Sequence, residues 1–583
     1  MKTAYSRLIT VCMLALAIPG VVFAWEPGPR ELDAVIKSGD FAAYFANISK
    51  WLDQKAPSAP GKMTEAALAA LLKEPVLRNA LDQRRFIETH STTNLSAFVK
   101  DAAKGKFLTW VMNSTEIMDL YMEPAATGID ALERWFKLYT DYPDTHEGMY
   151  LKLALAAAIC PPGGGGQYRS TEPIEWEKRF KNFKTAHAQK LLVPSFDHLT
   201  VGDYGKCLNC IGADTDIDWA RRMIKAWRPD LLEKEQIHKI VSEVWRRWSP
   251  FGFTNGFITV MEGGGKCGPR GTFGQFVCNA MGVPAIGVGQ PQHCTFAARC
   301  DYPETEPQVG SIWKVYQGRG WEYSDCGGNT YGPEWVERTT REYRIGERSL
   351  IAHMRWLASS LSSKERADAI LALATKVPKP VNTQAPMGVP ASEVDVVFAG
   401  KGAKTDPAKK DVPIDFNAEG PGASTSASHT LGRPPKVVEE PIAVVPGVIH
   451  VEAETFTNSF ADPLYPAEQE GSVFVFDCAT GGKQIYFQRN MKVSWVDYSI
   501  DVPEAGTYAL ELMYAVANRD MILEVGNGTE KLATASIPGT TGLWRKMDPA
   551  DIKLNKGVQS LRITSPSGQR GISIRWLELK LKK

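Results

Sequence analysis

The sequence has almost no net charge, which excludes partners that need a strongly charged surface. Lys and Arg together number 67 and Asp and Glu 66, so the formal net charge at pH 7 is +1. Nucleic acids and anionic lipid surfaces attract proteins with a marked excess of positive charge. Apolar residues make up 44 % of the chain and charged residues 23 %, which is ordinary for a globular protein. We therefore expect no nucleic acid partner.

Long apolar runs are also lacking, except for one at the start of the chain. Leu8 to Val22 is almost wholly apolar, Lys2 and Arg7 supply positive charge around its start, and Val22-Phe23-Ala24 offers compact residues for cleavage. The run is short for a membrane anchor, and no second one follows. We expect a signal peptide over residues 1–24, a secreted or periplasmic protein, and no membrane span. Roughly 560 residues remain, enough for two or three domains.

Cysteine is present in an odd number once the signal peptide is removed. Cys12 leaves with the signal peptide and nine of the ten cysteines remain, so at least one cannot pair within the chain. Cys207-Leu208-Asn209-Cys210 is a lone CxxC motif, and the second pair that a zinc site would need is missing. We expect a disulfide at Cys207 and Cys210, either local or longer in range. The front of the chain also lacks a convincing pair of facing carboxylates for glycan hydrolysis.

Helical periodicity dominates the first part of the chain. Apolar residues recur three and four apart in Ala66–Leu81, Gly148–Ile159 and Leu232–Trp248, and each segment predicts a helix. Cys160-Pro161-Pro162 and four glycines end the second of these helices. Another helical segment, Glu347–Lys376, closes the front part. Residues 377–446 are rich in proline, glycine, serine and lysine, which is typical of a linker.

The end of the chain has the alternation of β-strands. Val496, Tyr498, Ile500 and Val502 alternate with polar residues, and a turn follows at 503–506. The same alternation continues at Tyr508, Leu510, Leu512 and Tyr514, a hairpin signal lies at Gly526-Asn527-Gly528, and a last strand carries Ile572, Ile574 and Trp576. Many short strands with turns between them predict a β-sandwich. The fold class is therefore α+β, divided into a helical region (25–250), a mixed core (251–376), the linker (377–446) and the sandwich (447–583).

The segment around Cys267 carries the chemistry. Gly263-Gly264-Gly265 precede Cys267, and Phe273, Phe276, Val277, Ala280 and Met281 behind it mark one face of a helix that starts just after the cysteine. The unpaired N–H groups and positive dipole end of that helix favour thiolate over thiol. The same N–H groups can stabilise an oxyanion on an attacked acyl carbon. We therefore expect Cys267 to be a nucleophile.

A candidate base follows in the order that a cysteine–histidine enzyme needs. The helix is expected to end at Gly282, and a strand begins at Pro284. His293 opens a second apolar stretch, and strand-like pieces at Ile312–Tyr316 and Trp321–Ser324 come next. Three other histidines lie in segments with no matching nucleophile or ligand spacing: His146, His198 and His353.

These residues resemble the transglutaminase-like superfamily, which has a papain-like core. The likeness rests on Cys267, on Gly282-Val283-Pro284-Ala285 fifteen residues later, and on Trp313–Tyr316 with Gly320–Asp325, and covers residues 263–325. It implies a catalytic triad of Cys267, His293 and Asp325. The position where the family usually has its histidine is Ser311 in this chain. His293 lies earlier in the sequence, and an inserted hairpin separates the two positions. Gln317 is therefore an alternative to Asp325.

The last 130 residues or so resemble family 6 and related carbohydrate-binding modules. The matching pieces are Val448–Glu454, Trp495–Tyr498, Val502–Tyr508 and Ile537–Trp544. The resemblance implies sugar stacking on Tyr486 and Trp544, with Ser573 as a polar contact. The family's usual final strand, Asn-Ile-Asp-Trp, is Ser573-Ile574-Arg575-Trp576 here.

A charged residue opposes the family's structural calcium in this chain. Arg575 stands where the family has a calcium-binding aspartate, so its charge would repel a cation held by Glu452 and Glu454. We expect no cofactor.

Together these features predict a secreted cysteine-dependent amide hydrolase or acyl transferase, of the cysteine protease type rather than a cross-linking enzyme. Its substrate would be a peptide or glycoprotein, and the rear module would hold it near a polysaccharide ligand. The alternative is a catalytically silent transglutaminase-fold protein that serves as an extracellular scaffold for binding carbohydrate or glycoprotein.

Overall fold

The structure is a computed structural model, and its described residues form two compact units. Unit 1 joins Met1–Asp119 to Leu350–Val377, and unit 2 joins Leu120–Ser349 to Pro378–Lys583. The described residues are 25–122, 128–162, 174–243, 257, 267–290, 293–299, 313–315, 323–324, 330–331, 347–375, 447–461, 473–488, 493–517, 520–569 and 571–582. The predicted signal peptide and linker lie outside these ranges. Residues 350–375 belong to unit 1 with the first helices.

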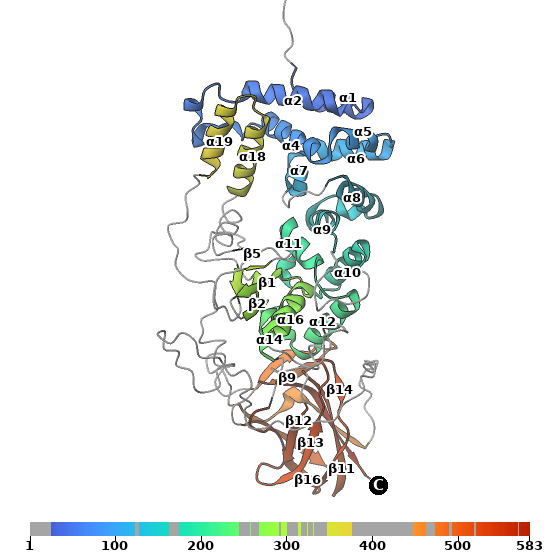
Figure 1. The fold of residues 1–583 in the computed structure, drawn as a ribbon. Helices are drawn as coiled ribbons and strands as arrows, with labels where there is room; N and C mark the ends of the chain where they lie inside the picture. The colour runs from blue at the N-terminus through green and yellow to red at the C-terminus, as the bar shows by residue number, and fades with distance from the viewer. Residues whose placement is uncertain are drawn as a thin grey trace, which may run out of the picture. The chain divides into compact units, whose positions relative to one another are not determined.

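Unit 1 is all-helical in its described residues. Its elements are α1 (Pro29–Ser38), α2 (Phe41–Lys55), η1 (Pro60–Lys62), α3 (Glu65–Leu71), α4 (Pro75–His90), α5 (Thr92–Phe98), α6 (Ala102–Met112), the start of α7 (Thr115–Met122), α18 (Glu347–Ser360) and α19 (Lys364–Thr375). The helix predicted over Ala66–Leu81 is two helices, because Pro75 cannot continue α3 but suits the first turn of α4. Figure 1 shows α18 and α19 beside α4.

Buried polar bonds tie the helices of unit 1 together. The Tyr44 hydroxyl of α2 donates to Gln83 Oε1 of α4 at 2.8 Å, and Gln83 Nε2 donates to the Met112 carbonyl at the end of α6 at 2.9 Å. Arg84 of α4 donates to the hydroxyl and the carbonyl of Ser359 at the end of α18, at 3.1 and 3.0 Å. Arg84 therefore anchors the end of α18 to α4, although Ser359 lies 275 positions later in the sequence.

The first part of unit 2 is a group of helices around α9 (Gly148–Ile159), which is apolar on nearly all sides and buried from Leu153 to Ile159. Its neighbours are α8 (Ile129–Asp141), α10 (Trp176–Ala188) and α11 (Val201–Leu208). Further along lie η2 (Pro143–Thr145), η3 (Pro194–His198), α12 (Asp214–Trp227), α13 (Pro229–Glu233), η4 (Ile237–Lys239) and α14 (Ile240–Glu243). The predicted helix over Gly148–Ile159 is confirmed.

The helix predicted over Leu232–Trp248 is wrong in its first half. α13 ends at Glu233, and Glu235 has a φ of 53°, a left-handed conformation that no α-helix can include. A 3₁₀ turn then leads into α14 at Ile240, and the described part of the chain stops at residue 243. The apolar spacing is real, but buried Leu231 and Ile237 reach the core from two separate short elements.

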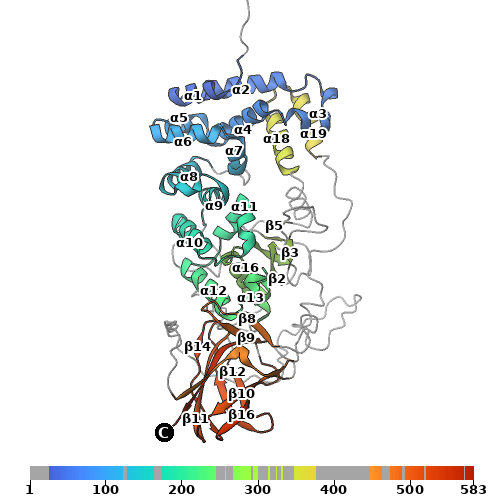
Figure 2. The same ribbon diagram turned by 180° about the vertical axis from the view of Figure 1, so that it is seen from behind.

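Helix α16 (Cys267–Ala280) and a small antiparallel sheet form the middle of unit 2. The sheet has the order β1 (Ala285–Gln290), β2 (His293–Arg299) and β3 (Trp313–Val315). A separate pair joins β4 (Tyr323–Ser324) to β5 (Thr330–Tyr331). Figure 2 shows α16 next to β2 from the side opposite to Figure 1.

The C-terminal part is a β-sandwich with its own core. One sheet has the order β13-β12-β16-β10-β7, and the other β14-β11-β17-β9-β8, with β15 and β6 on β11 and β17. The strands are β6 (Val448–Glu452), β7 (Asn458–Phe460), β8 (Phe474–Asp477), β9 (Lys483–Phe487), β10 (Ser494–Val502), β11 (Gly506–Val516), β12 (Met521–Gly526), β13 (Lys531–Ile537), β14 (Arg545–Lys546), β15 (Ala550–Leu554), β16 (Gly557–Ser565) and β17 (Ile572–Leu581), with the 3₁₀ turn η6 (Ala453–Thr455) after β6. All the alternating residues named from the sequence are buried, and the predicted hairpin joins β12 to β13. The sandwich prediction is confirmed.

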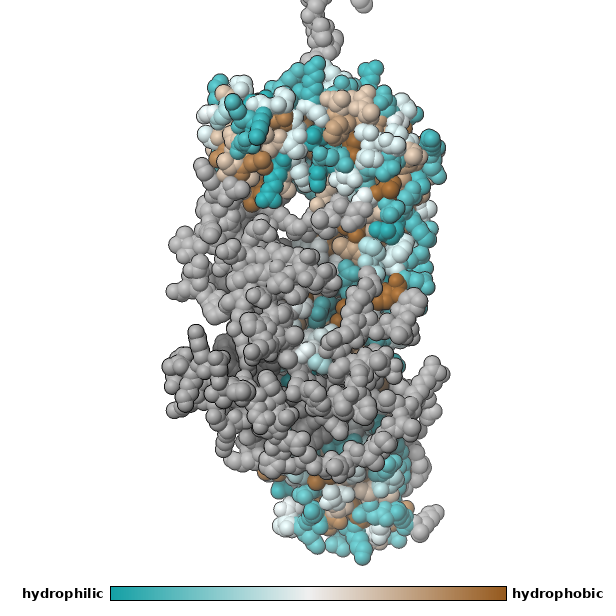
Figure 3. Space-filling view, in the orientation of Figure 1, coloured by the Kyte–Doolittle hydropathy of each residue, from teal (hydrophilic) through white to brown (hydrophobic). Residues whose placement is uncertain are grey.

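The surfaces carry the mixture expected from the composition. On the face shown in Figure 3, teal and brown residues are interspersed over unit 1. No helix among the described residues is long and apolar enough to cross a membrane.

Candidate functional site

Helix α16 begins at Cys267, one residue before the predicted start. Its apolar face, from Phe273 to Met281, is buried, and Gly282 with a φ of 86° follows the helix end. The ring of Phe276 stacks on Phe257 at 4.0 Å between centroids, which fixes the helix in the core. In the first turn, buried Arg270 donates to the Val241 carbonyl at 2.7 Å. A guanidinium one turn after Cys267 adds positive charge to that of the helix dipole.

Two glycines allow α16 to lie directly on β2. A Cβ on Gly271 would come within 2.9 Å of Thr295 Cα, and one on Gly274 within 2.3 Å of Phe296 Cε1. Real side chains do not tolerate such distances, so only glycine permits this approach. The first turn of α16 therefore contacts the strand two residues after His293.

The other end of α16 is anchored to the start of the hairpin. The side chain of Asn279, which is fully buried, accepts from the Ala285 N–H at 2.7 Å and donates to the Ala285 carbonyl at 3.2 Å. Along α16, the distance from Asn279 back to Cys267 is about 18 Å. Along β1, the distance from Ala285 to Gln290 is about 17 Å, so the two elements run nearly the same length from their shared anchor. Gln290 pairs with His293. The helix start and the first residue of β2 thus lie at the same end of this substructure.

The described backbone includes two of the predicted catalytic residues. Cys267 is the first residue of α16 and His293 the first of β2, while their side chains fall outside the described part of the structure. Asp325 and its alternative Gln317 also lie outside it. Of the later predicted strands, β3 pairs with β2 and β4 with β5.

The CxxC cysteines differ from the prediction. Cys207 and Cys210 are buried thiols rather than disulfide-bonded, so the predicted disulfide is wrong. Burial raises the pKa of Cys207 well above its ordinary value and that of Cys210 to about 11. Cys207 lies inside α11 and Cys210 just beyond its end, where Cys210 Sγ approaches the Phe276 carbonyl at 3.5 Å. Both are packing residues with little thiolate at neutral pH.

The three predicted sugar-binding residues all belong to the sandwich and are buried. Tyr486 is 1 % exposed, Ser573 0 % and Trp544 6 %. Ser573 pairs with Tyr486 across β17 and β9. Residues of the α12–α13 connection cover Tyr486 and Ser573, so both side chains contact the chain's own helices instead of solvent.

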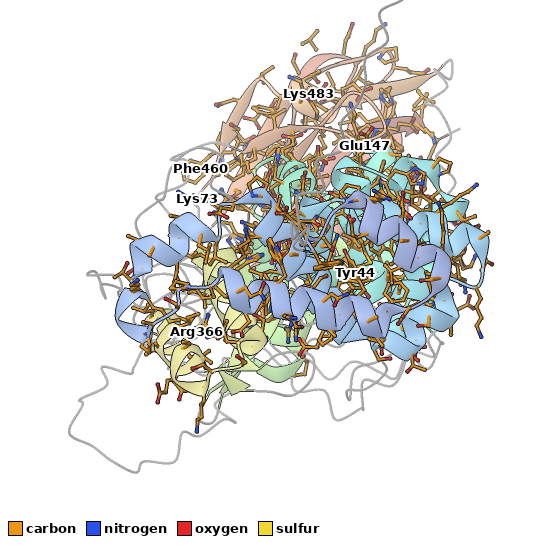
Figure 4. All side chains as sticks on the ribbon, turned by 90° about the horizontal axis from the view of Figure 1, so that it is seen from above. Tyr44, Lys73, Glu147, Arg366, Phe460 and Lys483 are labelled. Atoms are coloured by element: carbon orange, nitrogen blue, oxygen red, sulfur yellow. The ribbon has the colours of Figure 1, made fainter. Side chains whose placement is uncertain are left out.

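A cavity of about 300 Å³ opens beside this contact. Charged residues of both signs line it from α13 and the sandwich, among them Asp230, Glu233 and Lys234 on one side and Asp477 and Lys483 on the other. Figure 4 labels Lys483 on the sandwich. The cavity shares its wall with β8, whose Phe474 ring lies 6.5 Å from that of Tyr486.

A second cluster of reactive side chains lies in unit 1 and involves His353, which the sequence left without partners. His353 Nε2 of α18 lies 2.8 Å from Asp82 Oδ1 of α4 and 3.3 Å from Asp119 Oδ1 of α7, and Arg78 bonds to Asp119. Burial opposes the imidazolium, but the hydrogen bonds to Asp119 and Asp82 outweigh it and raise the pKa of His353 to about 9. Each of the three residues offers one ligand atom within 4.8 Å of the others, as a divalent metal site would need. With the imidazolium in place, the cluster is a closed ion network.

The sequence could not reveal this cluster, because His353 and Asp82 are 271 positions apart. Nothing in their local segments resembles ligand spacing.

Of the residues weighed for calcium, Glu452 and Arg575 contact protein groups. His450 Nε2 lies 3.2 Å from Glu452 Oε1, and Arg575 donates to the carbonyls of Thr480 and Gly481 at 3.3 and 3.5 Å. Glu454 Oε2 is buried with no partner among the described residues. The Arg575 guanidinium thus donates hydrogen bonds to carbonyl oxygens, which are groups of the kind that bind calcium.

Comparison with known proteins gives solved structures that match the sandwich. No known protein family matches the sequence, and no curated protein matches it. Solved structures similar to the C-terminal β region include the C-terminal CBM6 of LamC, a marine laminarinase from Zobellia galactanivorans (20 % identity, 23 % of this chain and 98 % of that one). Others are CsCBM6-3 from Clostridium stercorarium in complex with cellobiose (18 %, 23 % and 94 %) and CBM6cm-2 from Cellvibrio mixtus lichenase 5A in complex with cellotriose (17 %, 23 % and 98 %). The TM-score is 0.19 in each case. The C-terminal β region is similar to carbohydrate-binding modules.

Proposed function

We propose that the chain is an exported cysteine-dependent amide hydrolase or acyl transferase that uses Cys267 and His293. The observation that supports this most is the packing of α16 on the hairpin. Gly271 against Thr295 and Asn279 against Ala285 bring the start of α16 and the start of β2 to one end. A nucleophile at a helix start facing a base on the adjacent sheet is the arrangement that thiol acyl transfer requires.

The proposed chemistry follows from these positions. The Cys267 thiolate attacks the amide carbonyl carbon, and N–H groups in the first turn of α16 stabilise the oxyanion. His293 gives its proton to the departing amine as the C–N bond breaks, which leaves a thioester on Cys267. Water then attacks the thioester while His293 takes its proton, and the acid product leaves with the thiolate restored. An amine in place of water gives transfer. Asp325 or Gln317 orients the imidazole, and the substrate is a peptide or glycoprotein.

Alkylation with an iodoacetamide probe, mapped by mass spectrometry, tests the proposal. Cys267 should react fastest, because a thiolate is the reactive form. His293→Ala should slow its labelling, while labelling of Cys207 and Cys210, which are buried and have raised pKa values, should stay low in both proteins. Equal labelling of all thiols, or labelling of Cys267 that ignores His293→Ala, would support the silent scaffold instead.

A second function, sugar binding by the sandwich at Tyr486, Trp544 and Ser573, is favoured by the pairing of Tyr486 with Ser573. An aromatic face beside hydroxyl and amide groups is how proteins hold sugar rings. Gln484, next to Ser573 on the adjoining strand, adds an amide to the set. Because two of the similar structures contain cellobiose and cellotriose, β-linked glucans are the probes to use. Tyr486→Ala should abolish any cellotriose binding measured by titration calorimetry, whereas binding unchanged by this variant would move the sugar site elsewhere.

A further inference from the structure

The sugar-binding end of the sandwich is in contact with a short piece of the same chain. Helix α12 ends at Trp227, Arg228 links it to α13, and together Ala226, Trp227 and Arg228 form what we call the α12–α13 corner. Figures 1 and 2, drawn from opposite sides, both show α12 next to the end of the sandwich that carries β9. All of these residues belong to unit 2.

Two carbonyl groups of the corner accept hydrogen bonds from the sandwich. Ser573 Oγ donates to the Trp227 carbonyl at 2.6 Å, and Gln484 Nε2 donates to the Ala226 carbonyl at 3.1 Å. The last carbonyls of a helix have no partner within the helix and carry its negative dipole end. Gln484 and Ser573, both 0 % exposed, therefore cap α12.

The side chain of Arg228 covers the aromatic part of the same face. Its guanidinium lies 4.4 Å from the centre of the Tyr486 ring, and Nη1 donates to the Tyr486 hydroxyl at 3.3 Å. Asp230 holds it in place through two hydrogen bonds of 2.8 Å. A flat, polar group lies on the ring where a sugar ring would stack.

The loop that leads to Trp544 also packs on α12. Gly542 has a φ of 77° and packs so tightly on α12 that a Cβ there would come within 2.2 Å of Met223 Cγ. The Trp544 side chain that follows is 6 % exposed. The corner thus covers Tyr486 and Ser573, and the loop that leads to Trp544 packs on α12.

The contact leaves polar atoms of the face unsatisfied. Three buried atoms have no hydrogen-bond partner among the described residues: Gln484 Oε1 and Trp544 Nε1 of the sandwich, and Trp227 Nε1 of the corner. A buried polar atom without a partner costs about 1–3 kcal/mol. A sugar, which carries hydroxyl groups that both donate and accept, can satisfy the two atoms on the sandwich side. The corner therefore packs on this face without satisfying all of the hydrogen-bonding groups of the face.

We propose that the α12–α13 corner occupies the sugar-binding face of the sandwich as an internal ligand, so that a glycan must displace it to bind. The corner presents carbonyl acceptors and a stacked planar group to the residues that would hold sugar hydroxyls and a sugar ring. This inference rests on the proposed sugar site at Tyr486, Trp544 and Ser573. It makes glycan capture and opening of the contact with α12 one coupled event.

The test compares variants of the full chain at two arginines: Arg228, which directly follows α12, and Arg222, which lies within α12. Arg228→Glu loses the stack on Tyr486 and repels Asp230, and Arg228→Ala is the milder form. Arg222→Glu is the matched control, because Arg222 is exposed on α12 and its hydrogen bond is to the Asp218 carbonyl of the same helix. Two readouts are taken: hydrogen exchange in α12, α13, β9 and β17, and cellotriose affinity by calorimetry. Arg228→Glu should raise exchange in all four elements and tighten cellotriose binding about tenfold or more, since apparent affinity scales with the open fraction. Arg228→Ala should do both to a smaller extent, and Arg222→Glu neither.

The two readouts separate failure of this inference from failure of the sugar site. Wild-type protein that binds cellotriose through Tyr486 as tightly as Arg228→Glu would overturn the competition. Unchanged exchange in Arg228→Glu would overturn the docking itself. Raised exchange without binding of cellotriose or longer β-linked glucans would overturn the sugar site while leaving the corner as a purely structural joint.

Discussion

His353 is the residue whose charge matters most to unit 1. It faces Asp82 and Asp119, and Arg78 contacts the second of these carboxylates. Burial raises the pKa of Asp82 to about 6, although the bond to His353 acts in the opposite direction. For Asp119, burial is outweighed by its bonds to His353 and Arg78, and its pKa is lowered. The imidazolium therefore holds one fully buried carboxylate, Asp82, and one partly exposed carboxylate, Asp119.

A pH dependence follows from the raised pKa of His353. Its value of about 9 lies above the ordinary 6.5, so its contribution to stability is complete below pH 6.5 and is lost as pH rises through 9. The size is on the order of 3 kcal/mol. Imidazole C2–H exchange followed by mass spectrometry should report a pKa near 9 for His353. In Asp82→Asn the value should fall. An ordinary His353 pKa in the wild-type protein would mean that the ion network does not form.

At the scale of single elements, the approach of α16 to β2 gives the sharpest prediction. Gly271→Ala would place a methyl group 2.9 Å from the backbone of Thr295, which cannot rotate away. We expect a loss of about 1–3 kcal/mol in the free energy of unfolding. Labelling of Cys267 should also slow, because the helix start moves away from the strand that His293 begins.

The control for this prediction is another helical glycine. Gly105→Ala in α6 meets its nearest atom, Ile36 Cγ2, at 3.5 Å, an ordinary contact. That variant should keep full stability or gain up to about 1 kcal/mol. Denaturant unfolding and the rate of Cys267 alkylation are the two measurements. Normal values of both in Gly271→Ala would show that α16 does not lie on β2 as closely as described.

Helix α19 depends on one arginine that Figure 4 labels. Arg366 donates to the Asp53 carboxylate and carbonyl at 2.8 Å each, and to the carbonyls of Pro57 and Ala56 at 3.0 and 3.2 Å, around the end of α2. Arg366→Ala should weaken α19 docking by about 2 kcal/mol, as read from hydrogen exchange in α19. Arg366→Lys should not restore it, because an ammonium cannot reproduce the planar fork. Exposed Arg355 on α18 provides the control, and equal effects of Arg355→Ala would contradict the assignment.

The sequence was most informative where one element determines its own structure. Gly148–Ile159 is bounded by a glycine and a Cys-Pro-Pro step, and the structure has the same helix. The sandwich strands follow from period-two alternation, because each buries one side. The segment at Leu232–Trp248 misled because α13 and η4 bury similar residues from two short turns, and only the backbone of Glu235 shows the break.

Features that depend on distant residues could not be predicted. Cys207 and Cys210 have the spacing of a disulfide, but their burial in and beside α11 keeps both as thiols. The sequence predicts sugar contacts at Tyr486, Trp544 and Ser573, yet nothing in β9 indicates that Arg228, 258 positions before Tyr486, covers the Tyr486 ring. The partners of His353 were hidden for the same reason.

At the scale of the whole molecule, the chain leaves unit 1 after Asp119 and returns to it at Leu350. The stability of unit 1 therefore requires two segments that are separated by 230 residues of unit 2. The polar side-chain contacts that join them include His353 with Asp82 and Asp119, Arg84 with Ser359, and Arg366 and Ser362 with Asp53. Loss of one of them should loosen both segments together, because neither α18 nor α19 is long enough to persist alone.

Asp82→Asn tests this cooperativity. Breaking a buried ion pair from one side typically costs about 3–5 kcal/mol, so hydrogen exchange should rise in α4 and also in α18 and α19. The sandwich strands β10 and β16 have their own core and should keep wild-type protection. Asp33→Asn, an exposed change on α1, should alter neither region by more than about 0.5 kcal/mol. If exchange rose in α4 while α18 and α19 stayed protected, the two segments would not form one folding unit, since a shared core cannot loosen on one side only.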